Sequence, residues 1–524
     1  MSAPLSTVRP RLTVAMIVRD AEHLLNETLN SALQICDELI VCDTGSKDST
    51  CEMARRHRAQ VIQRSWNDSF AEARNAAWES ATGDWVLWLD AGERLATDQA
   101  SALRSFIDSQ ADPARAYMMA IVVPPAAGEI AGEQVAQIRL VPNRKQIRFV
   151  GRVRETLKPS LAQAGIIIDA VPWRILRSER DTDPHQKRTK AVRNLGLLEK
   201  TVAEIGQTPD LLVALGEAMT TVGDTEGAIA CFLKALQNGS RGSSIQREAY
   251  YGLLTALDRD STQRQQQISV CLEALEHFPL DAQLLCAMGG YLQAEGRVDM
   301  AVRAYQTAFE YGQIDPELWH VGDILDIAAA CLSLAHQLLN DDDGARRVLE
   351  KGLQRAHNSA RLRRHLIDLH VKYDRRKEAL AEFDLLPTET PHREALRSAI
   401  RGGCLASQQN WAPALAYLQT AYRAGCRDAL CLRWLAVALI GTHDLASAHD
   451  VLTEWQTMEP RSAEVQQYLA AVHGIASAEL AADGGDDRQL RFDTGAPSGQ
   501  NVAPTPNLGT MPGITLYGPA GVKR

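Results

Sequence analysis

Three stretches near the N-terminus decide the fold: LTVAMIVRDAEHLLNETLNSAL (residues 12–33), ELIVCDTGSKDST (38–50) and WNDSFAEARNAAWESATGDWVLWLDAGERL (66–95). Each combines a short apolar run with polar turn residues or an amphipathic segment. This alternation is typical of βαβ units, in which helices connect parallel strands. The first part of the chain is therefore predicted to form an α/β layer.

Short runs of branched apolar residues mark the expected strands of this layer. We expect strands at 12–18, 38–42, 59–64 and 85–90, with helices at 21–33, 48–56 and 70–80 between them. Three later segments, 116–123, 134–141 and 147–156, are also strand-like and would add to the same sheet or cover it.

Beyond about residue 186 the strand pattern ends and a helical repeat begins. The same spacing of small and large apolar residues recurs in Gly216, Ala228, Phe232 and Ala235; in Gly289, Ala301, Tyr305 and Ala308; in Gly402, Ala414, Leu418 and Ala421; and in Ala436, Ala448 and Leu452. Successive alanines, Ala379, Ala414 and Ala448, are 35 and 34 residues apart. This period resembles the tetratricopeptide (TPR) helix pair and predicts about seven units stacked into a solenoid.

Composition excludes several classes of function. The 524 residues carry 56 basic and 65 acidic side chains, a net charge of −9, which disfavours nucleic acid as a general partner. No apolar stretch has the length of a signal peptide core or of a transmembrane segment, so a cytoplasmic protein is expected. The 10 cysteines form no Cys-x-x-Cys pair, which favours buried thiols over disulfides or zinc ligands.

The three quoted stretches together resemble the nucleotide-sugar half of family 2 glycosyltransferases, and more closely the branch that carries TPR repeats. The resemblance covers about the first third of the chain, in the expected order and spacing. It implies a Rossmann-like GT-A fold and a hexosyltransferase-like enzyme. The implied reaction takes a nucleotide-diphospho-sugar donor through a single displacement, with inversion at the sugar carbon.

These patterns divide the chain into four expected parts. We expect a short N-terminal extension at 1–11, an α/β GT-A glycosyltransferase domain at 12–182, an all-α TPR-like helical repeat domain at 186–475 and a disordered tail at 483–524. The tail is rich in Gly, Pro, Asp, Asn and Thr, so it cannot bury enough apolar area to offset the entropy of ordering.

Polar residues at the ends of the first two strands are candidates for nucleotide binding. Asp43 ends a strand and opens a tight turn, so its spacing alone ranks a turn and capping role first, whereas the resemblance favours contact with the nucleotide. Asp48 is expected to cap the next helix. Val18 and Arg19 end the first strand, where the resemblance implies nucleotide contact. For Arg19, a solvated surface charge is almost equally expected.

Two residues of the third stretch, Arg74 and Asn75, occupy a position that faces the donor nucleotide in the family. Arg74 lies among small residues on an expected helix and needs an anion or solvent. A guanidinium group suits a phosphate or a base carbonyl. The resemblance therefore implies that both residues bind the donor.

Asp90 ends the fourth strand at the first carboxylate of the family's Asp-Xaa-Asp signature, which implies a divalent ion bridging the donor phosphates. This chain has Gly92 at the second aspartate position, followed by Glu93. Asp90 is therefore the candidate ligand for Mg or Mn, and the ion is expected to be weakly held or dispensable.

Two arginines replace histidines that are typical of the family. Arg154 stands in the phrase IRFVGRVRE (147–155), and Arg177 in WRILRS (173–178). Guanidinium cannot bind a metal ion, so our hypothesis is that Arg154 and Arg177, with Arg152, supply positive charge to the diphosphate. Pairing with surface carboxylates is an equally weighted alternative.

Inverting transfer also needs a carboxylate that takes the proton of the acceptor hydroxyl. Glu155 is the first candidate and Glu93 the second. In a regular strand, Glu155 would face opposite Arg154, so both reach one site only at a bend or a strand end.

Three functions remain open on the sequence. The first is an active glycosyltransferase whose TPR array recruits a protein or glycan acceptor. The second is a catalytically degenerate domain that serves as a TPR interaction scaffold, and the third is a sensor that binds the donor without turnover. The face of the array could bind a protein partner, a second copy of the chain, or nothing.

Overall fold

The computed structural model describes residues 9–124, 132–178, 184–258, 263–388, 390, 392–458 and 463–482. The tail expected at 483–524 lies outside these ranges, as do residues 1–8 of the expected extension. The chain divides into two compact units. The first holds the described residues up to Gln263 together with Ile314–Gly322, and the second holds Arg264–Gln313 and the described residues from Asp323 onward. The domain limits expected from the sequence stay predictions.

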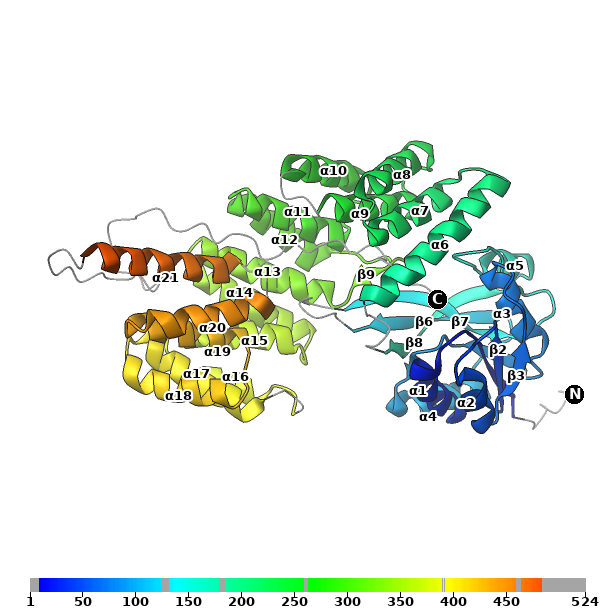
Figure 1. Cartoon of the computed structure of the whole chain (residues 1–524), viewed down its shortest axis with the longest axis horizontal. Helices are drawn as coiled ribbons and strands as arrows, with labels where there is room; N and C mark the ends of the chain where they lie inside the picture. The colour runs from blue at the N-terminus through cyan, green and yellow to red at the C-terminus, as the bar shows by residue number, and fades with distance from the viewer. Residues whose placement is uncertain are drawn as a thin grey trace, which may run out of the picture. The chain divides into compact units, whose positions relative to one another are not determined.

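The first unit is built on one mixed sheet with the strand order β3-β2-β1-β4-β7-β6-β8-β5, and β9 pairs with β7 (Figure 1). Strands β1 to β4 are parallel to one another, and β4 pairs with β7 in antiparallel fashion. The strands are β1 (Leu12–Val18), β2 (Glu38–Asp43), β3 (Gln60–Gln63), β4 (Trp85–Trp88), β5 (Glu93–Leu95), β6 (Arg115–Val123), β7 (Glu133–Pro142), β8 (Ile167–Arg177) and β9 (His320–Val321).

Helices cover both faces of this sheet. One face packs against α1 (Glu22–Leu33), α2 (Thr50–Arg56) and α4 (Thr97–Ser109), and the other against α3 (Phe70–Glu79) and α5 (Lys158–Gln163). Because both faces are buried, β1 and β4 are mostly apolar along their length instead of alternating. The predicted α/β layer is confirmed.

The segment Ile314–Gly322 lies between two helices of the repeat region in sequence but belongs to the first unit. Its strand β9 pairs with the start of β7, and Trp319 is buried in the core of that unit, 5% exposed.

The strand expected at 147–156 is wrong. Only an isolated bridge joins Val150 to Thr156, and the segment between them turns through Gly151 (φ 102°) and Arg154 (φ 55°). Glycine adopts this left-handed backbone without strain. The sequence reading also missed four elements, α4, α5, β5 and β8.

Helices make up the rest of both units. The first unit adds α6 (Pro184–Ile205), α7 (Pro209–Val222), α8 (Thr225–Asn238) and α9 (Ser244–Leu257). The second contains α10 (Arg264–His277), α11 (Ala282–Ala294), α12 (Val298–Tyr311), α13 (Ile324–Leu338), α14 (Asp342–Arg355), α15 (Ala360–Lys372), α16 (Arg376–Asp384), α17 (Arg393–Ser407), α18 (Trp411–Arg423), α19 (Ala429–Gly441), α20 (Leu445–Met458) and α21 (Ala463–Ala482).

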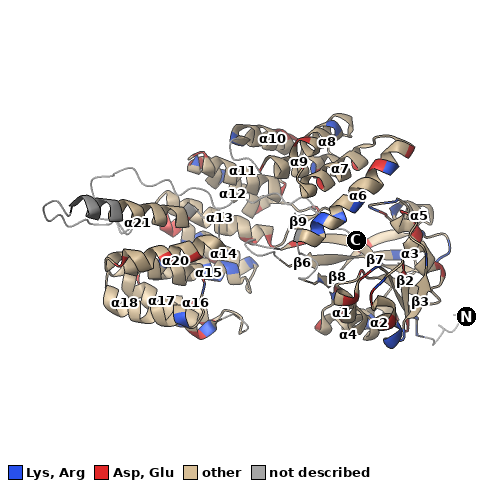
Figure 2. Ribbon diagram, viewed as in Figure 1, with Lys and Arg blue, Asp and Glu red and all other residues tan. Residues whose placement is uncertain are grey.

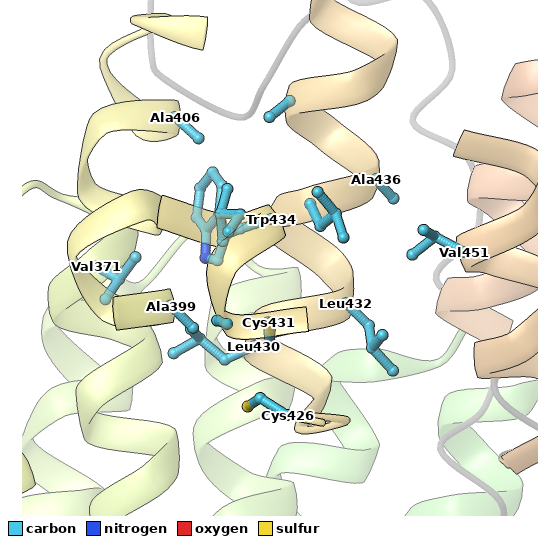
Figure 3. Packing of buried hydrophobic residues seen from close by; sticks show 14 of the residues in the cluster. Val371, Ala399, Ala406, Cys426, Leu430, Cys431, Leu432, Trp434, Ala436 and Val451 are labelled. Atoms are coloured by element: carbon cyan, nitrogen blue, oxygen red, sulfur yellow. The ribbon is translucent and has the colours of Figure 1, made fainter. Parts of the chain in front are cut away.

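The small residues of the repeat lie where two helices of a pair cross. A Cβ atom added to Gly289 on α11 would lie 2.4 Å from a ring carbon of Tyr305 on α12. The equivalent contact at Gly402 is 2.6 Å, to Leu418. Figure 3 shows the dense core near the C-terminal pairs, around Trp434. The TPR-like packing expected from the repeat is therefore confirmed.

Substituting Gly289 by alanine is expected to destabilise the pair α11 and α12 by about 1–3 kcal/mol, because the added methyl overpacks the helix crossing. Gly474→Ala on α21 is the matched control, since its added Cβ would meet no atom within 4 Å. Amide hydrogen exchange in peptides from α11 and α12 measures the change. Equal protection in the two variants would contradict the packing argument.

Three further features concern the described part of the chain as a whole. None of its helices combines the length and apolar character that crossing a bilayer requires. All ten cysteines fall in the described ranges, no disulfide joins them, and most are buried. Basic and acidic side chains are interspersed along the helices of each unit (Figure 2).

Candidate active site

The candidate site lies at the carboxyl ends of the parallel strands. Val18 ends β1, Asp43 ends β2, and Asp90 follows β4 by two residues. Because β1 lies between β2 and β4, these ends fall on one edge of the sheet, within about 10 Å of each other at the usual strand spacing. Ligands of open α/β sheets bind at this edge.

Asp43 holds the loop that follows β2. Its carboxylate is 2% exposed and accepts hydrogen bonds from the backbone N–H groups of Gly45 (3.2 Å) and Ser46 (3.1 Å). Asp48 accepts a bond from the N–H of Thr50 (3.0 Å) at the start of α2. The loop is thus fixed by its own carboxylates, in keeping with the turn role weighed for Asp43. The N-cap of α2 is Ser49 and not Asp48 as expected, although Asp48 accepts a bond from the first turn.

Val18 and Arg19 mark the end of β1. The carbonyl of Val18 accepts bonds from the N–H (3.0 Å) and hydroxyl (3.1 Å) of Thr44, which ties β1 to the loop after β2. The Arg19 side chain is about half exposed, with a 4.0 Å ion pair to Asp20. A ligand at this edge can therefore reach its guanidinium.

Arg74 joins two of the candidate carboxylates. Its side chain is fully buried; Nε donates to Glu155 Oε1 (2.7 Å) and Nη2 donates to Asp90 Oδ1 (2.9 Å). Its guanidinium also lies over the rings of Trp88 (4.5 Å) and Phe149 (5.4 Å). Burial lowers the pKa of Arg74, but the Asp90 and Glu155 carboxylates raise it by more. The net shift of the pKa is upward, and the group stays charged.

Arg139 on β7 joins the next pair of carboxylates. Its Nη2 donates to Glu93 Oε1 (2.9 Å) and lies 3.5 Å from Asp90 Oδ2, while Nη1 donates to the carbonyl of Trp88 (3.2 Å). Arg177 also donates to Glu93 Oε1 (2.8 Å). The second oxygen of Glu93 accepts from the backbone N–H of Asp90 (2.9 Å).

These side chains form one buried arginine–carboxylate cluster, which consists of Arg74, Arg139, Arg177, Asp90, Glu93 and Glu155. Positive and negative groups alternate along it, from Arg177 through Glu93, Arg139, Asp90 and Arg74 to Glu155. Three guanidinium groups balance three carboxylates. Buried charges persist when paired and hydrogen-bonded in this way.

Arg154 lies outside the cluster. Its left-handed backbone (φ 55°) turns the side chain away from Glu155, and the guanidinium pairs with Glu248 on α9 and Glu217 on α7. Burial lowers the pKa of Arg154, yet Glu248 and Glu217 raise it more, so the net shift is upward. Arg152 likewise pairs with Glu204 (2.6 Å). A diphosphate role for Arg154 stays a prediction, and in this conformation carboxylates hold its charge.

Asn75 fastens the segment that leads to Glu155. Its amide donates to the carbonyl of Phe149 (2.9 Å) and accepts from the N–H of the same residue (2.9 Å). Both polar atoms of the side chain are therefore used to position backbone. Donor contact by Asn75 stays a prediction.

Two arginines near the site were missed by the sequence reading. Arg139 could have been found as a charged residue inside an apolar strand, which requires a buried partner. Arg193, on α6, lies over the ring of Phe70 at 4.9 Å. Desolvation, and after it the like charge of Arg19, lowers the pKa of Arg193.

The carboxylates present do not fit a resident divalent ion. Asp90 and Glu93 each contact two guanidinium groups, so a divalent ion there would meet three buried cations. Within the described ranges, no group of three or more His, Cys, Asp or Glu side chains could hold a metal. A metal role for Asp90 stays a prediction that this arrangement disfavours.

Comparison with known proteins agrees with the geometry. Residues 13–120, which include Arg74, Asp90 and Glu93, match glycosyl transferase family 2. A TPR repeat-containing protein of Synechococcus elongatus is 32% identical over 255 residues, 48% of this chain and 62% of that protein. The SPbeta prophage-derived glycosyltransferase SunS of Bacillus subtilis is 22% identical over 233 residues, 44% of this chain and 54% of that protein.

The chain thus matches less than two thirds of the length of either relative. Among solved structures, a tetratricopeptide repeat protein from Parabacteroides merdae aligns with 51% of this chain and 100% of its own, at 17% identity and a TM-score of 0.40. Over residues 13–120 the N-terminal α/β domain thus matches glycosyl transferase family 2, and in this chain a tetratricopeptide-like helical region follows it.

Proposed function

We propose that this protein transfers a sugar from a nucleotide-diphospho-sugar donor to a protein or glycan acceptor, with inversion at the sugar carbon. The observation that carries the proposal is the buried arginine–carboxylate cluster at the carboxyl ends of the parallel strands. Replacing such a buried cluster by apolar residues is often neutral or stabilising, so its presence points to a function. The cluster also lies beside the carboxyl ends of parallel strands, where ligands of α/β proteins bind. A cytoplasmic location remains part of this proposal.

Glu155 is the proposed general base. In a single displacement, its carboxylate takes the proton of the acceptor hydroxyl while the acceptor oxygen bonds to the sugar carbon. The bond from that carbon to the diphosphate breaks, and the nucleoside diphosphate leaves with the electron pair. Glu93 is the weaker candidate, because both of its oxygens accept hydrogen bonds from Arg139, Arg177 or the Asp90 backbone.

Arginines are proposed to stabilise the leaving diphosphate. Arg74 lies at the centre of the cluster, Arg19 is exposed just beyond the end of β1, and Arg193 on α6 lies over the Phe70 ring. Charge-assisted bonds from guanidinium groups suit phosphate oxygens. A diphosphate would compete with Glu155 for Arg74, and loss of that bond would make Glu155 a stronger base. This scheme assigns no step to a metal ion, so Mg or Mn is dispensable in it.

The TPR-like region is proposed to recruit the acceptor or a partner protein. Helix pairs of this kind stack into extended surfaces that bind other chains. Its own helices also hold Arg154, through Glu217 and Glu248, so the turn that carries Glu155 is tied to α7 and α9 within the first unit.

Incubation of the full chain with a panel of nucleotide sugars, without acceptor, tests the proposal. The expected result is slow release of nucleoside diphosphate from one class of donor, with chelator present. The catalytically degenerate scaffold is the second candidate, favoured by the pairing of Glu155 with Arg74 and by Gly92 in place of an aspartate. Binding of no nucleotide sugar would favour the scaffold; binding without release, even with acceptor proteins, would favour a sensor.

A further inference from the structure

Arg139 is a deeply buried cation of the candidate site, and the sequence analysis assigned it no role. It lies on β7, its side chain is 1% exposed, and its strand pairs directly with β4. A guanidinium buried this deeply costs several kcal/mol unless anions compensate for the lost hydration. Its compensation comes from Glu93 (2.9 Å) and Asp90 (3.5 Å), which follow the end of β4.

Arg139 lies where a bound cation would lie, between the carboxylates of Asp90 and Glu93. A divalent ion between two carboxylates neutralises them and fixes their separation. Arg139 likewise bridges Asp90 and Glu93, and it shares the neutralisation of their two charges with Arg74 and Arg177. Its further bonds to the Trp88 carbonyl (3.2 Å) and Gln137 Oε1 (3.2 Å) fix its own position. An ion entering here would have to displace a guanidinium that contacts both carboxylates.

We propose that Arg139 is a built-in replacement for a divalent cation: it holds Asp90 and Glu93 in place, neutralises them together with Arg74 and Arg177, and excludes metal from the site. It is a positioning residue, since it acts on the donor through those carboxylates. The action of Arg139 on the donor rests on the proposed function. The exclusion of metal does not, because it depends only on charges that are present in the folded chain.

The charge balance predicts what replacement of Arg139 does. With Arg139 neutral, three carboxylates face two guanidinium groups, and Asp90 and Glu93 lose the cation between them. Oxygen ligands with uncompensated charge bind hard divalent ions. Arg139→Gln is therefore expected to gain affinity for Mn²⁺, whereas Arg139→Lys keeps the charge and is expected to exclude the ion as the wild type does.

Binding of Mn²⁺ to the full chain, followed by the loss of the paramagnetic resonance signal of the free ion, tests the proposal without any turnover. We expect no stoichiometric binding by the wild type or Arg139→Lys, and at least tenfold tighter binding by Arg139→Gln. The double variant Arg139→Gln with Asp90→Asn is expected to lose that gain. Circular dichroism and thermal melting establish that each variant is folded.

Two results would overturn the inference. One is stoichiometric Mn²⁺ binding by the wild type that Asp90→Asn abolishes, a measurement that needs no Arg139 variant to fold. The other is a folded Arg139→Gln variant with no gain in affinity. Failure of the proposed function is distinguishable: a chain that excludes Mn²⁺ but releases no nucleoside diphosphate refutes the transferase proposal alone. Release that requires Mn²⁺ refutes this inference and the metal-free scheme, while sugar transfer itself stands.

Discussion

Substituting Glu155 by glutamine is expected to lower the rate of sugar transfer by about 10²- to 10⁴-fold, the usual contribution of a general base. Glutamine has the same shape and can still accept the bond that Arg74 Nε donates at 2.7 Å. It cannot take a proton from the acceptor hydroxyl. Affinity for the nucleoside diphosphate is therefore expected to change little, and kinetics combined with calorimetric binding separates the two effects.

Glu72→Gln provides the matched control for this substitution. Glu72 is an exposed carboxylate on α3, and it accepts a bond from Asn67 (2.8 Å). It lies outside the arginine–carboxylate cluster, so its loss of charge is expected to leave transfer within twofold of the wild type. Unchanged turnover in Glu155→Gln would eliminate Glu155 as the base.

Replacing Arg74 by methionine is expected to have the largest effect on stability. Methionine preserves much of the apolar volume but leaves Asp90 and Glu155 without the cation between them. Removing one partner from a buried ion pair costs about 3–5 kcal/mol, because the remaining charge is buried without compensation. Denaturant unfolding of the first unit, followed by tryptophan fluorescence, measures the change, and donor binding is expected to be lost as well.

Arg94→Met is the matched control, because it removes an arginine from an exposed ion pair instead of a buried one. Arg94 pairs with Glu27 at 3.7 Å, and both side chains are exposed, 44% and 58%. Exposed pairs contribute about 0–1 kcal/mol, so this variant is expected to unfold almost as the wild type does. Equal destabilisation by Arg74→Met and Arg94→Met would mean that burial of the Arg74 ion pairs adds nothing to their effect on stability.

The parts of the fold that could be predicted from the sequence are those that local patterns specify. The strands β1, β2 and β4 are mostly apolar because both of their faces are covered, and polar turns follow them. The spacing of Gly289 and Tyr305 reflects a contact between neighbouring helices, so the repeat could be recognised without knowing which units stack. Asp43 and Asp90 could be placed at one edge because parallel strands end together.

The parts that could not be predicted depend on strand register far along the chain. Glu93 on β5 lies opposite Arg177 on β8, 84 residues away, and no local signal sets that pairing. Arg139 reaches the cluster because β7 pairs with β4. The turn at Gly151 and Arg154 reads as part of a strand, since its neighbours are apolar or branched, and it sends Arg154 away from the cluster.

The most direct test of the account is a crystal structure of the full chain with a nucleoside diphosphate bound and no divalent ion present. The account predicts a nucleotide at the carboxyl ends of β1, β2 and β4, with its phosphates against arginine side chains and Arg139 still bridging Asp90 and Glu93. A nucleotide bound elsewhere, or one that binds only when a metal ion displaces Arg139, would contradict it.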